Sequence, residues 1–293
     1  MLGRAQITFR RGESGGGVLR EALTIRAGAR RHRYVLLVHG YNTAQRGAKD
    51  SYDRFTGRVA RLARWFGRQV IYVYWPGDRR LKPWSTASYP LAIGKAQAVA
   101  PGFGRYLNAL RAPSRGPCDI VLIGHSLGCR LILETLLALG GPLVQARSLT
   151  LILLAAAVPV SLVKAGGRLH SAIARAQRAS IFYSPADETL ARWFRLGQMV
   201  AREGGFWPEA VGHRGRPKPG LWENSRHMNG YEHSDYWKGQ EAACQIARML
   251  GATVACPKAP RLIVGRRSTI SRPDPPARVA PAARSLAAAW DWT

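Results

Sequence analysis

The chain has 293 residues, of which 46% are hydrophobic and 9% aromatic. This length suffices for one large α/β domain or two small ones, and this composition excludes a chain that is disordered throughout. Lysine and arginine total 44 against 17 acidic residues, a formal net charge of +27. Such a surface attracts anions, but the basic residues are spread along the chain, so the charge indicates weak association or an arginine-rich composition rather than a defined site.

No segment of the sequence is typical of a secretory leader or a membrane span. Residues 1–17 contain no apolar core region. The longest apolar run, Leu149–Val163, contains Pro159 and is shorter than the ~20 residues that cross a bilayer. We therefore expect a cytoplasmic protein.

The chain has four cysteines: Cys118, Cys129, Cys244 and Cys256. They form neither a CxxC pair nor a regular metal-ligand spacing. Free thiols in a reducing compartment are the expectation, with no metal site.

The N-terminal segment is basic and contains a glycine-rich turn at Gly15–Gly17. Alternating stretches at Gln6–Arg10 and Ala22–Arg26 flank the turn, and they predict an antiparallel hairpin at a sheet edge.

Short apolar runs then alternate with stretches of helical periodicity. The runs predict strands at residues 34–38, 70–74, 119–123, 150–154 and 180–183. Helices are expected at 51–66, in a weaker stretch that ends at 110 and is interrupted near Pro101, and at 127–139, 169–178 and 240–250. This alternation predicts right-handed βαβ units and a mostly parallel sheet flanked by helices.

Residues 195–230 are rich in Gly, Pro, Trp and Arg, and they predict one long loop. This loop and residues 78–104 are candidates to cover a site. Trp193, Trp207 and Trp222 would then either line that cover or only pack the loops.

The most informative segment, Gly124-His-Ser-Leu-Gly128, matches G-x-S-x-G. An apolar strand precedes it and an apolar helix follows it, which is the context that a nucleophile elbow requires. The glycines leave room for a tight turn that holds the serine at the carboxyl end of the sheet. We predict Ser126 as a nucleophile and the backbone N–H of Leu127 as an oxyanion donor, assisted by the helix dipole.

A second oxyanion donor is expected in the loop after an earlier strand. His39-Gly-Tyr-Asn42 follows the first apolar run, and the N–H of Tyr41 is the candidate. Asn42 is expected to brace the loop. His39 precedes the serine, whereas the base follows the acid in the chain order of α/β-hydrolases, so we interpret His39 as structural.

A serine nucleophile needs a base, and the base needs an orienting carboxylate. Asp187 follows the run 180–183 at the carboxyl end of a late strand, and it is the predicted acid. Glu188 is the adjacent alternative. Asp187 also suits the cap of a following helix, and the two roles are compatible.

The base must lie beyond the acid, which leaves His213, His227 and His233. His213 lies among Gly and Arg residues in the long loop. His233 stands just before the final helix, where the base of such a triad is expected. We predict His233, with His227 as the alternative.

Five motifs together resemble those of an uncharacterised group of bacterial α/β-hydrolases that is esterase- and lipase-like in its catalytic parts. They are His39-Gly-Tyr-Asn42, Trp75-Pro-Gly77, Gly124-His-Ser-Leu-Gly128, Ser184-Pro-Ala-Asp187 and His233. The resemblance covers about residues 34–250. It implies the triad Ser126, Asp187 and His233 but no substrate. The chain departs from the group at Gly77, where Ser is usual, and at Leu127, where Met is usual; neither change removes a catalytic group.

The predicted organisation is a single catalytic domain of the α/β-hydrolase fold. It spans 34–250, between the hairpin of residues 1–33 and a Pro-, Arg- and Ala-rich tail over 251–293. We expect the part from about 268 to 293 to be mobile.

The predicted activity is cleavage of an ester or related acyl bond in a small-molecule or lipid substrate, through an acyl-enzyme and without metal or organic cofactor. A thioesterase, a peptidase or a haloperoxidase-like enzyme would use the same groups. The second hypothesis is a binding module that holds anionic lipid or nucleic acid through its basic surface. The sequence makes no prediction of oligomeric state.

Overall fold

The computed structural model describes residues 5–9, 33–66, 69–77, 88–110, 116–215, 222 and 224–256. The chain divides into two units, Met1–Pro260 and Arg261–Thr293, and all described residues belong to the first.

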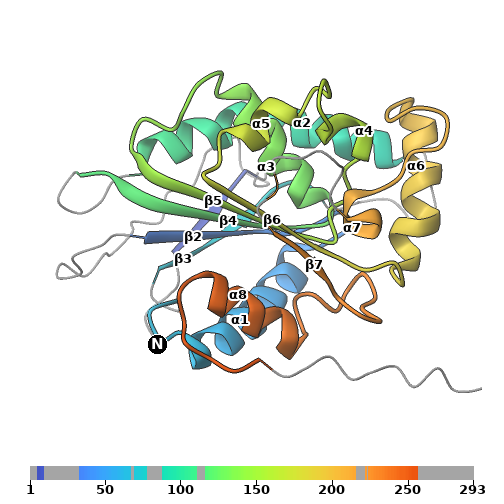
Figure 1. Cartoon of the computed structure of the whole chain (residues 1–293). Coiled ribbons are helices and arrows are strands. Elements are labelled where there is room, and N and C mark those ends of the chain that lie inside the picture. The colour runs from blue at the N-terminus through green and yellow to red at the C-terminus, as the bar shows by residue number, and fades with distance from the viewer. Residues whose placement is uncertain are drawn as a thin grey trace, which may run out of the picture. The chain divides into compact units, whose positions relative to one another are not determined.

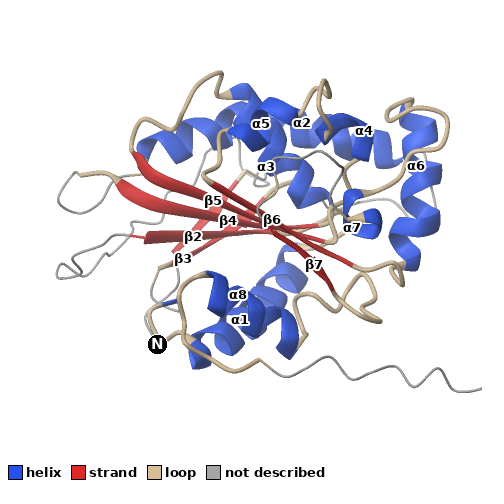
Figure 2. Ribbon diagram, in the orientation of Figure 1, coloured by secondary structure: helices blue, strands red, loops and turns tan. Residues whose placement is uncertain are grey.

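A seven-stranded sheet forms the centre of this unit (Figure 2). Its strands are β1 (Ala5–Thr8), β2 (Arg33–Val38), β3 (Val70–Tyr74), β4 (Cys118–His125), β5 (Ala146–Leu154), β6 (Arg178–Tyr183) and β7 (Asn224–His227). Their order is β1-β3-β2-β4-β5-β6-β7, and neighbouring strands pair in parallel throughout. Central strands such as β3 and β4 are buried along their whole length, which explains their continuous apolar sequences.

Helices cover both faces of the sheet (Figure 1). On one face lie α1 (Gln45–Leu62) and α8 (Gln240–Met249). On the other lie α2 (Ser88–Ala109), α3 (Leu127–Ala138), α4 (Val160–Val163) and α5 (His170–Ala174). Each face encloses its own hydrophobic core. The structure is thus the α/β-hydrolase architecture that the sequence predicts.

The N-terminal segment departs from expectation in one respect. β1 lies at the sheet edge as expected, but it pairs in parallel with β3. The second stretch of the expected hairpin, Ala22–Arg26, lies outside the described residues, as does the tail from 268 to 293. The hairpin and the three-part domain division therefore stay predictions.

The expectation of one long loop over 195–230 is wrong. This stretch contains α6 (Phe194–Ala201), α7 (Val211–Arg214) and β7, the last strand of the sheet. A π-helical turn, Thr189–Trp193, leads into α6. The sequence pattern does not predict these elements, because α7 has only four residues and the β7 sequence, Asn-Ser-Arg-His, contains no apolar residue. Likewise α2 continues through Pro101, where an interruption was expected.

Two of the four cysteines are bonded to each other. Cys244 on α8 and Cys256 form a disulfide with a Cα–Cα distance of 5.5 Å. Cys118 and Cys129 are buried and take no part in this disulfide. The expectation of free thiols is therefore wrong for Cys244 and Cys256, which lie 12 residues apart in the sequence.

Removing this disulfide is expected to destabilise the fold. A loop of this length restricts the unfolded chain by about 3 kcal/mol, so Cys244→Ser/Cys256→Ser should lower the free energy of unfolding by roughly that amount. Urea denaturation measures the loss. Cys118→Ser, which removes a thiol outside the disulfide, is the comparison, and an unfolding curve that is the same with and without reductant would contradict the prediction.

Candidate active site

Ser126 stands on the turn between β4 and α3. Its backbone has φ 54° and ψ −126°, a conformation that side-chain-bearing residues rarely adopt. A Cβ at Gly124 would lie 2.7 Å from Cδ1 of Ile132, and a Cβ at Gly128 would overlap the carbonyl oxygen of His39. The two glycines of G-x-S-x-G are therefore required by close packing around the strained serine.

The segment after β2 passes directly beside this serine. A Cβ at Gly40 would lie 2.7 Å from Cβ of Ser126, so only glycine permits this approach. Asn42, with φ 55°, donates its backbone N–H to the carbonyl oxygen of Gly77 at 2.7 Å. Tyr41 lies between these two residues and directly follows Gly40, the residue that approaches the serine. Leu127, on the other side, begins α3, where first-turn amides have no partner within the helix.

His39 is buried and braces the same segment. Its Nδ1–H donates to the carbonyl oxygen of Gly40 at 2.9 Å, and its Nε2 accepts the backbone N–H of Trp75 at 3.3 Å. The indole N–H of Trp75 donates to the carbonyl oxygen of His39 at 2.8 Å, and the two rings stack. Both ring nitrogens of His39 are thereby engaged in structural contacts, as its place before the serine suggests.

Ser126, Asp187 and His233 come together at the carboxyl end of the sheet. His233 Nε2 lies 2.9 Å from Oγ of Ser126, and His233 Nδ1 lies 2.8 Å from Oδ2 of Asp187. The carboxylate is fully buried, whereas the imidazole is 20% exposed. This geometry suits a neutral imidazole whose Nδ1–H donates to the carboxylate while Nε2 accepts the serine hydroxyl proton.

The remaining candidates lie elsewhere. His227 is exposed on β7 and stacks on Tyr183, and His213 lies on α7. The Glu188 carboxylate is 65% exposed and pairs with Arg192. The Oδ1 atom of Asp187 accepts the backbone N–H of Leu190 at 3.0 Å, so Asp187 also holds the start of the following turn.

The comparison with protein families agrees with this architecture. The sequence model of a family described as "Alpha/beta hydrolase of unknown function (DUF900)" matches residues 20–218. The chain belongs to this family. The matched range contains Ser126 and Asp187 and ends before His233. A search of the curated proteins finds no match to this DUF900 member.

Several solved structures resemble this DUF900 hydrolase in fold. An esterase of Pyrobaculum calidifontis is 18% identical, with 77% of each chain covered and a TM-score of 0.43. The NocB thioesterase domain from the nocardicin cluster is 17% identical over 75% of this chain and 94% of its own, with a TM-score of 0.38. The RedJ thioesterase from the prodiginine pathway of Streptomyces coelicolor is 16% identical over 78% of this chain and 90% of its own, with a TM-score of 0.37. These likenesses carry no information about the substrate of this chain.

One residue that sequence reasoning missed is His125, the residue before the nucleophile. Its Nε2–H donates to the backbone carbonyl of His233 at 2.7 Å, and the two rings lie 4.9 Å apart. Burial, together with the nearby His233, lowers the pKa of His125 to about 3. His125 therefore stays a neutral donor, and it ties the loop that carries His233 to the elbow.

The tryptophans of the expected cover behave differently from one another. Trp222 is buried in one of the two hydrophobic cores, so the packing alternative holds for it. Trp193 and Trp207 are 51% and 59% exposed, so neither is packed inside a loop. Within the described ranges, no group of three His, Cys, Asp or Glu residues is placed to hold a metal ion.

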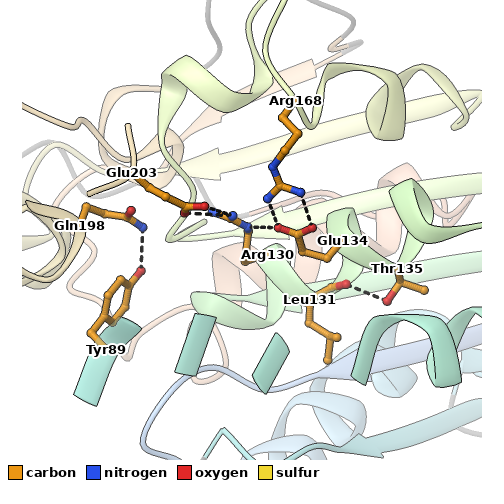
Figure 3. A network of polar contacts seen from close by, with 8 residues as sticks. All are labelled: Tyr89, Arg130, Leu131, Glu134, Thr135, Arg168, Gln198 and Glu203. Atoms are coloured by element: carbon orange, nitrogen blue, oxygen red, sulfur yellow. Dashed lines mark hydrogen bonds and ion pairs between the residues drawn. The ribbon is translucent and has the colours of Figure 1, made fainter. Parts of the chain in front are cut away.

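A buried charge network, also missed from the sequence, lies next to the elbow (Figure 3). Arg130, on the first turn of α3, is fully buried. Its guanidinium forms ion pairs with the carboxylates of Glu134 at 2.6 Å and Glu203 at 3.0 Å. Glu134 also binds the guanidinium of Arg168 through both oxygens. Burial alone would raise the pKa of Glu134, but Arg168 and Arg130 together hold that pKa below its ordinary value. Glu134 is therefore ionised at neutral pH, and the network links α3 to the end of α6.

Breaking this network is expected to be costly. Arg130→Met leaves the buried carboxylate of Glu134 with fewer partners, which should reduce the free energy of unfolding by about 3–5 kcal/mol. Chemical denaturation measures the difference. The matched change Lys49→Met removes the cation of the exposed pair Lys49–Asp53 and should lose at most about 1 kcal/mol. Equal losses in the two variants would contradict the assignment of a structural role to Arg130.

Proposed function

We propose that this α/β-hydrolase cleaves an ester or related acyl bond through a serine nucleophile. The observation that carries the proposal is the unbroken line of contacts from Ser126 Oγ through the His233 imidazole to the buried Asp187 carboxylate, at 2.9 and 2.8 Å. A serine hydroxyl is a weak nucleophile until a neighbouring base accepts its proton. The strained elbow and the triad contacts together supply that activation.

In the first step, Oγ of Ser126 attacks the acyl carbon while Nε2 of His233 takes the hydroxyl proton. The negative charge that develops on the carbonyl oxygen is held by the backbone N–H groups of Leu127 and Tyr41. Asp187 stabilises the imidazolium and keeps its orientation. His233 then gives the proton to the leaving alcohol as the acyl–oxygen bond breaks.

In the second step, water attacks the acyl-enzyme. His233 takes a proton from this water, the carboxylic acid leaves, and the proton returns to Oγ of Ser126. None of these steps needs a metal or an organic cofactor. Thioesters and activated amides pass through the same tetrahedral intermediate, so the triad fits those substrates as well as oxygen esters.

The alternative function is a binding module that uses the +27 surface to hold anionic lipid or nucleic acid. Binding of lipid or nucleic acid does not require a strained serine that is hydrogen-bonded to a histidine–carboxylate pair. The site therefore favours the hydrolase over the binding module. Electrostatic association with an anionic membrane or with nucleic acid remains compatible with hydrolysis.

The compartment is a separate question. In the part of the chain that the structure describes, none of the helices has the length and apolar character needed to cross a lipid bilayer. The cytoplasmic location expected from the sequence stays a prediction. The Cys244–Cys256 disulfide argues against it, because disulfides persist mainly in oxidising compartments.

Hydrolysis of p-nitrophenyl esters of short and medium acyl chains by the full-length protein tests the proposal. We expect turnover that rises and falls with chain length, because the acyl group must fit a pocket of finite depth. The absence of turnover at every chain length, for oxygen esters and thioesters alike, would favour the binding module.

A further inference from the structure

Exposed apolar side chains gather on one part of the surface. Among the described residues, six of the eight exposed large hydrophobic side chains lie between positions 193 and 207; they are Trp193, Leu196, Met199, Val200, Phe206 and Trp207. We call these six residues the α6 face. Monomeric proteins rarely keep so many large apolar groups together in water unless the patch binds something.

The spacing of these residues makes a continuous surface. Trp193, Leu196 and Val200 stand three and four positions apart, so they share one side of the helical segment. Phe206, at 89% exposure, and Trp207 follow in the loop after α6. The opposite side of α6 is fixed to the core, since Gly197 packs against the Tyr89 ring and Phe194 contacts that ring edge-on.

Arginines border the α6 face. The guanidinium of Arg195 lies 5.1 Å from the centre of the Trp207 ring, and Arg192 and Arg202 are exposed on the same segment. Glu188 pairs with Arg192, and Glu203 is turned toward Arg130. Tryptophan and other apolar residues beside arginine are the composition of helices that lie in the boundary between lipid headgroups and acyl chains.

The segment that carries the α6 face is fixed at both ends to residues of the active-site region. Its N-terminal turn starts beside Asp187, which accepts the backbone N–H of Leu190. At its other end Glu203 pairs with Arg130, four residues after Ser126 on α3. A surface bound to this face would therefore be held at the end of the sheet that carries the triad, where Figure 1 shows α6.

We propose that the α6 face docks on anionic lipid bilayers and that the substrates are acyl esters carried by such a surface. The net charge of +27 favours a negative surface and opposes the pairing of two copies of this chain. This inference rests on the proposed hydrolase function, because it supplies the substrate class for the same triad.

Vesicle binding by the full-length protein tests the docking. Vesicles of phosphatidylcholine alone are compared with vesicles that also contain phosphatidylglycerol, and bound protein is measured by sedimentation and by the emission shift of tryptophan. Phe206→Ser/Trp207→Ser should weaken binding to the anionic vesicles at least ~tenfold, because two large apolar groups no longer insert. Arg195→Gln should reduce the preference for phosphatidylglycerol.

Two matched variants serve as controls. Val144→Ser changes a side chain that is 78% exposed just before β5, at the opposite end of the sheet from Ser126, and should bind vesicles like the unchanged protein. Arg61→Gln removes an exposed charge from α1, which lies on the other face of the sheet, and should keep the lipid preference. Equal thermal unfolding of all variants shows that folding is not the cause of a difference.

The outcomes separate docking from catalysis. Hydrolysis of water-soluble p-nitrophenyl acetate should be the same in Phe206→Ser/Trp207→Ser and in the unchanged protein. Ester turnover without binding to anionic vesicles overturns the docking but keeps the hydrolase. Three other results would also overturn the docking. They are vesicle binding that Phe206→Ser/Trp207→Ser leaves unchanged, binding to nucleic acid but not to vesicles, and a dimer of the unchanged protein that only this double variant converts to monomers. Vesicle binding that depends on the α6 face, without turnover of any ester, would support docking and reject the hydrolase.

Discussion

Ser126→Ala is expected to reduce kcat for p-nitrophenyl ester hydrolysis by at least ~10⁴-fold. The reason is the loss of Oγ, the attacking atom, which lies 2.9 Å from His233 Nε2 and donates its proton to it. Alanine keeps the same backbone turn without that oxygen, so the fold should persist. The measurement is kcat and KM on one ester, with thermal unfolding as a check of the fold.

The matched control for this experiment is Ser171→Ala. Ser171 is exposed on α5 and lies outside the triad, so this variant should hydrolyse the ester at the unchanged rate. If Ser126→Ala retained a tenth or more of the original kcat, the nucleophile would have to be another group and the mechanism would be wrong.

The second large effect is expected for Asp187→Asn. The carboxylate is fully buried and accepts two hydrogen bonds, from His233 Nδ1 at 2.8 Å and from the backbone N–H of Leu190 at 3.0 Å. An amide oxygen retains the contact to Leu190, so the turn should survive. It carries no charge to stabilise the imidazolium, and it permits the wrong tautomer of His233. We expect kcat to fall by about 10⁴-fold with little change in KM.

Glu188→Gln provides the comparison within the same turn. Its carboxylate is 65% exposed and pairs with Arg192, so neutralising it should leave kcat within about twofold of the original value, as is common for exposed charges away from a site. A larger loss of kcat in Glu188→Gln than in Asp187→Asn would show that Glu188, and not Asp187, is the acid.

The fold could be predicted from the sequence because each central strand is encoded by a short apolar run that can be recognised without knowledge of distant contacts. β3 and β4 are runs of apolar residues with both faces buried, and the elbow sequence requires glycine at 124 and 128 for reasons that act over a few residues. The proximity of Ser126, Asp187 and His233 followed from chain order and from the rule that parallel strands end at one edge. Their catalytic roles stay a prediction.

The parts that escaped prediction depend on contacts between distant residues or lack a pattern. Arg130 and Glu203 are 73 positions apart, and nothing in either neighbourhood indicates that they meet. His125 contacts the carbonyl of a residue 108 positions away. β7 has no apolar residue, because an edge strand with half-exposed positions does not need one. The disulfide could not be inferred from spacing, since its two cysteines belong to no recognisable motif.

The central claim is that Ser126 is an activated nucleophile, and covalent labelling tests it most directly. The full-length protein is treated with a fluorophosphonate, and the mass of the intact protein and of its peptides is measured. We predict one adduct per chain, on the peptide that contains Ser126, with none on Ser126→Ala and much slower labelling of Asp187→Asn. An unlabelled native protein with an intact fold, or an adduct on another residue, would contradict the account.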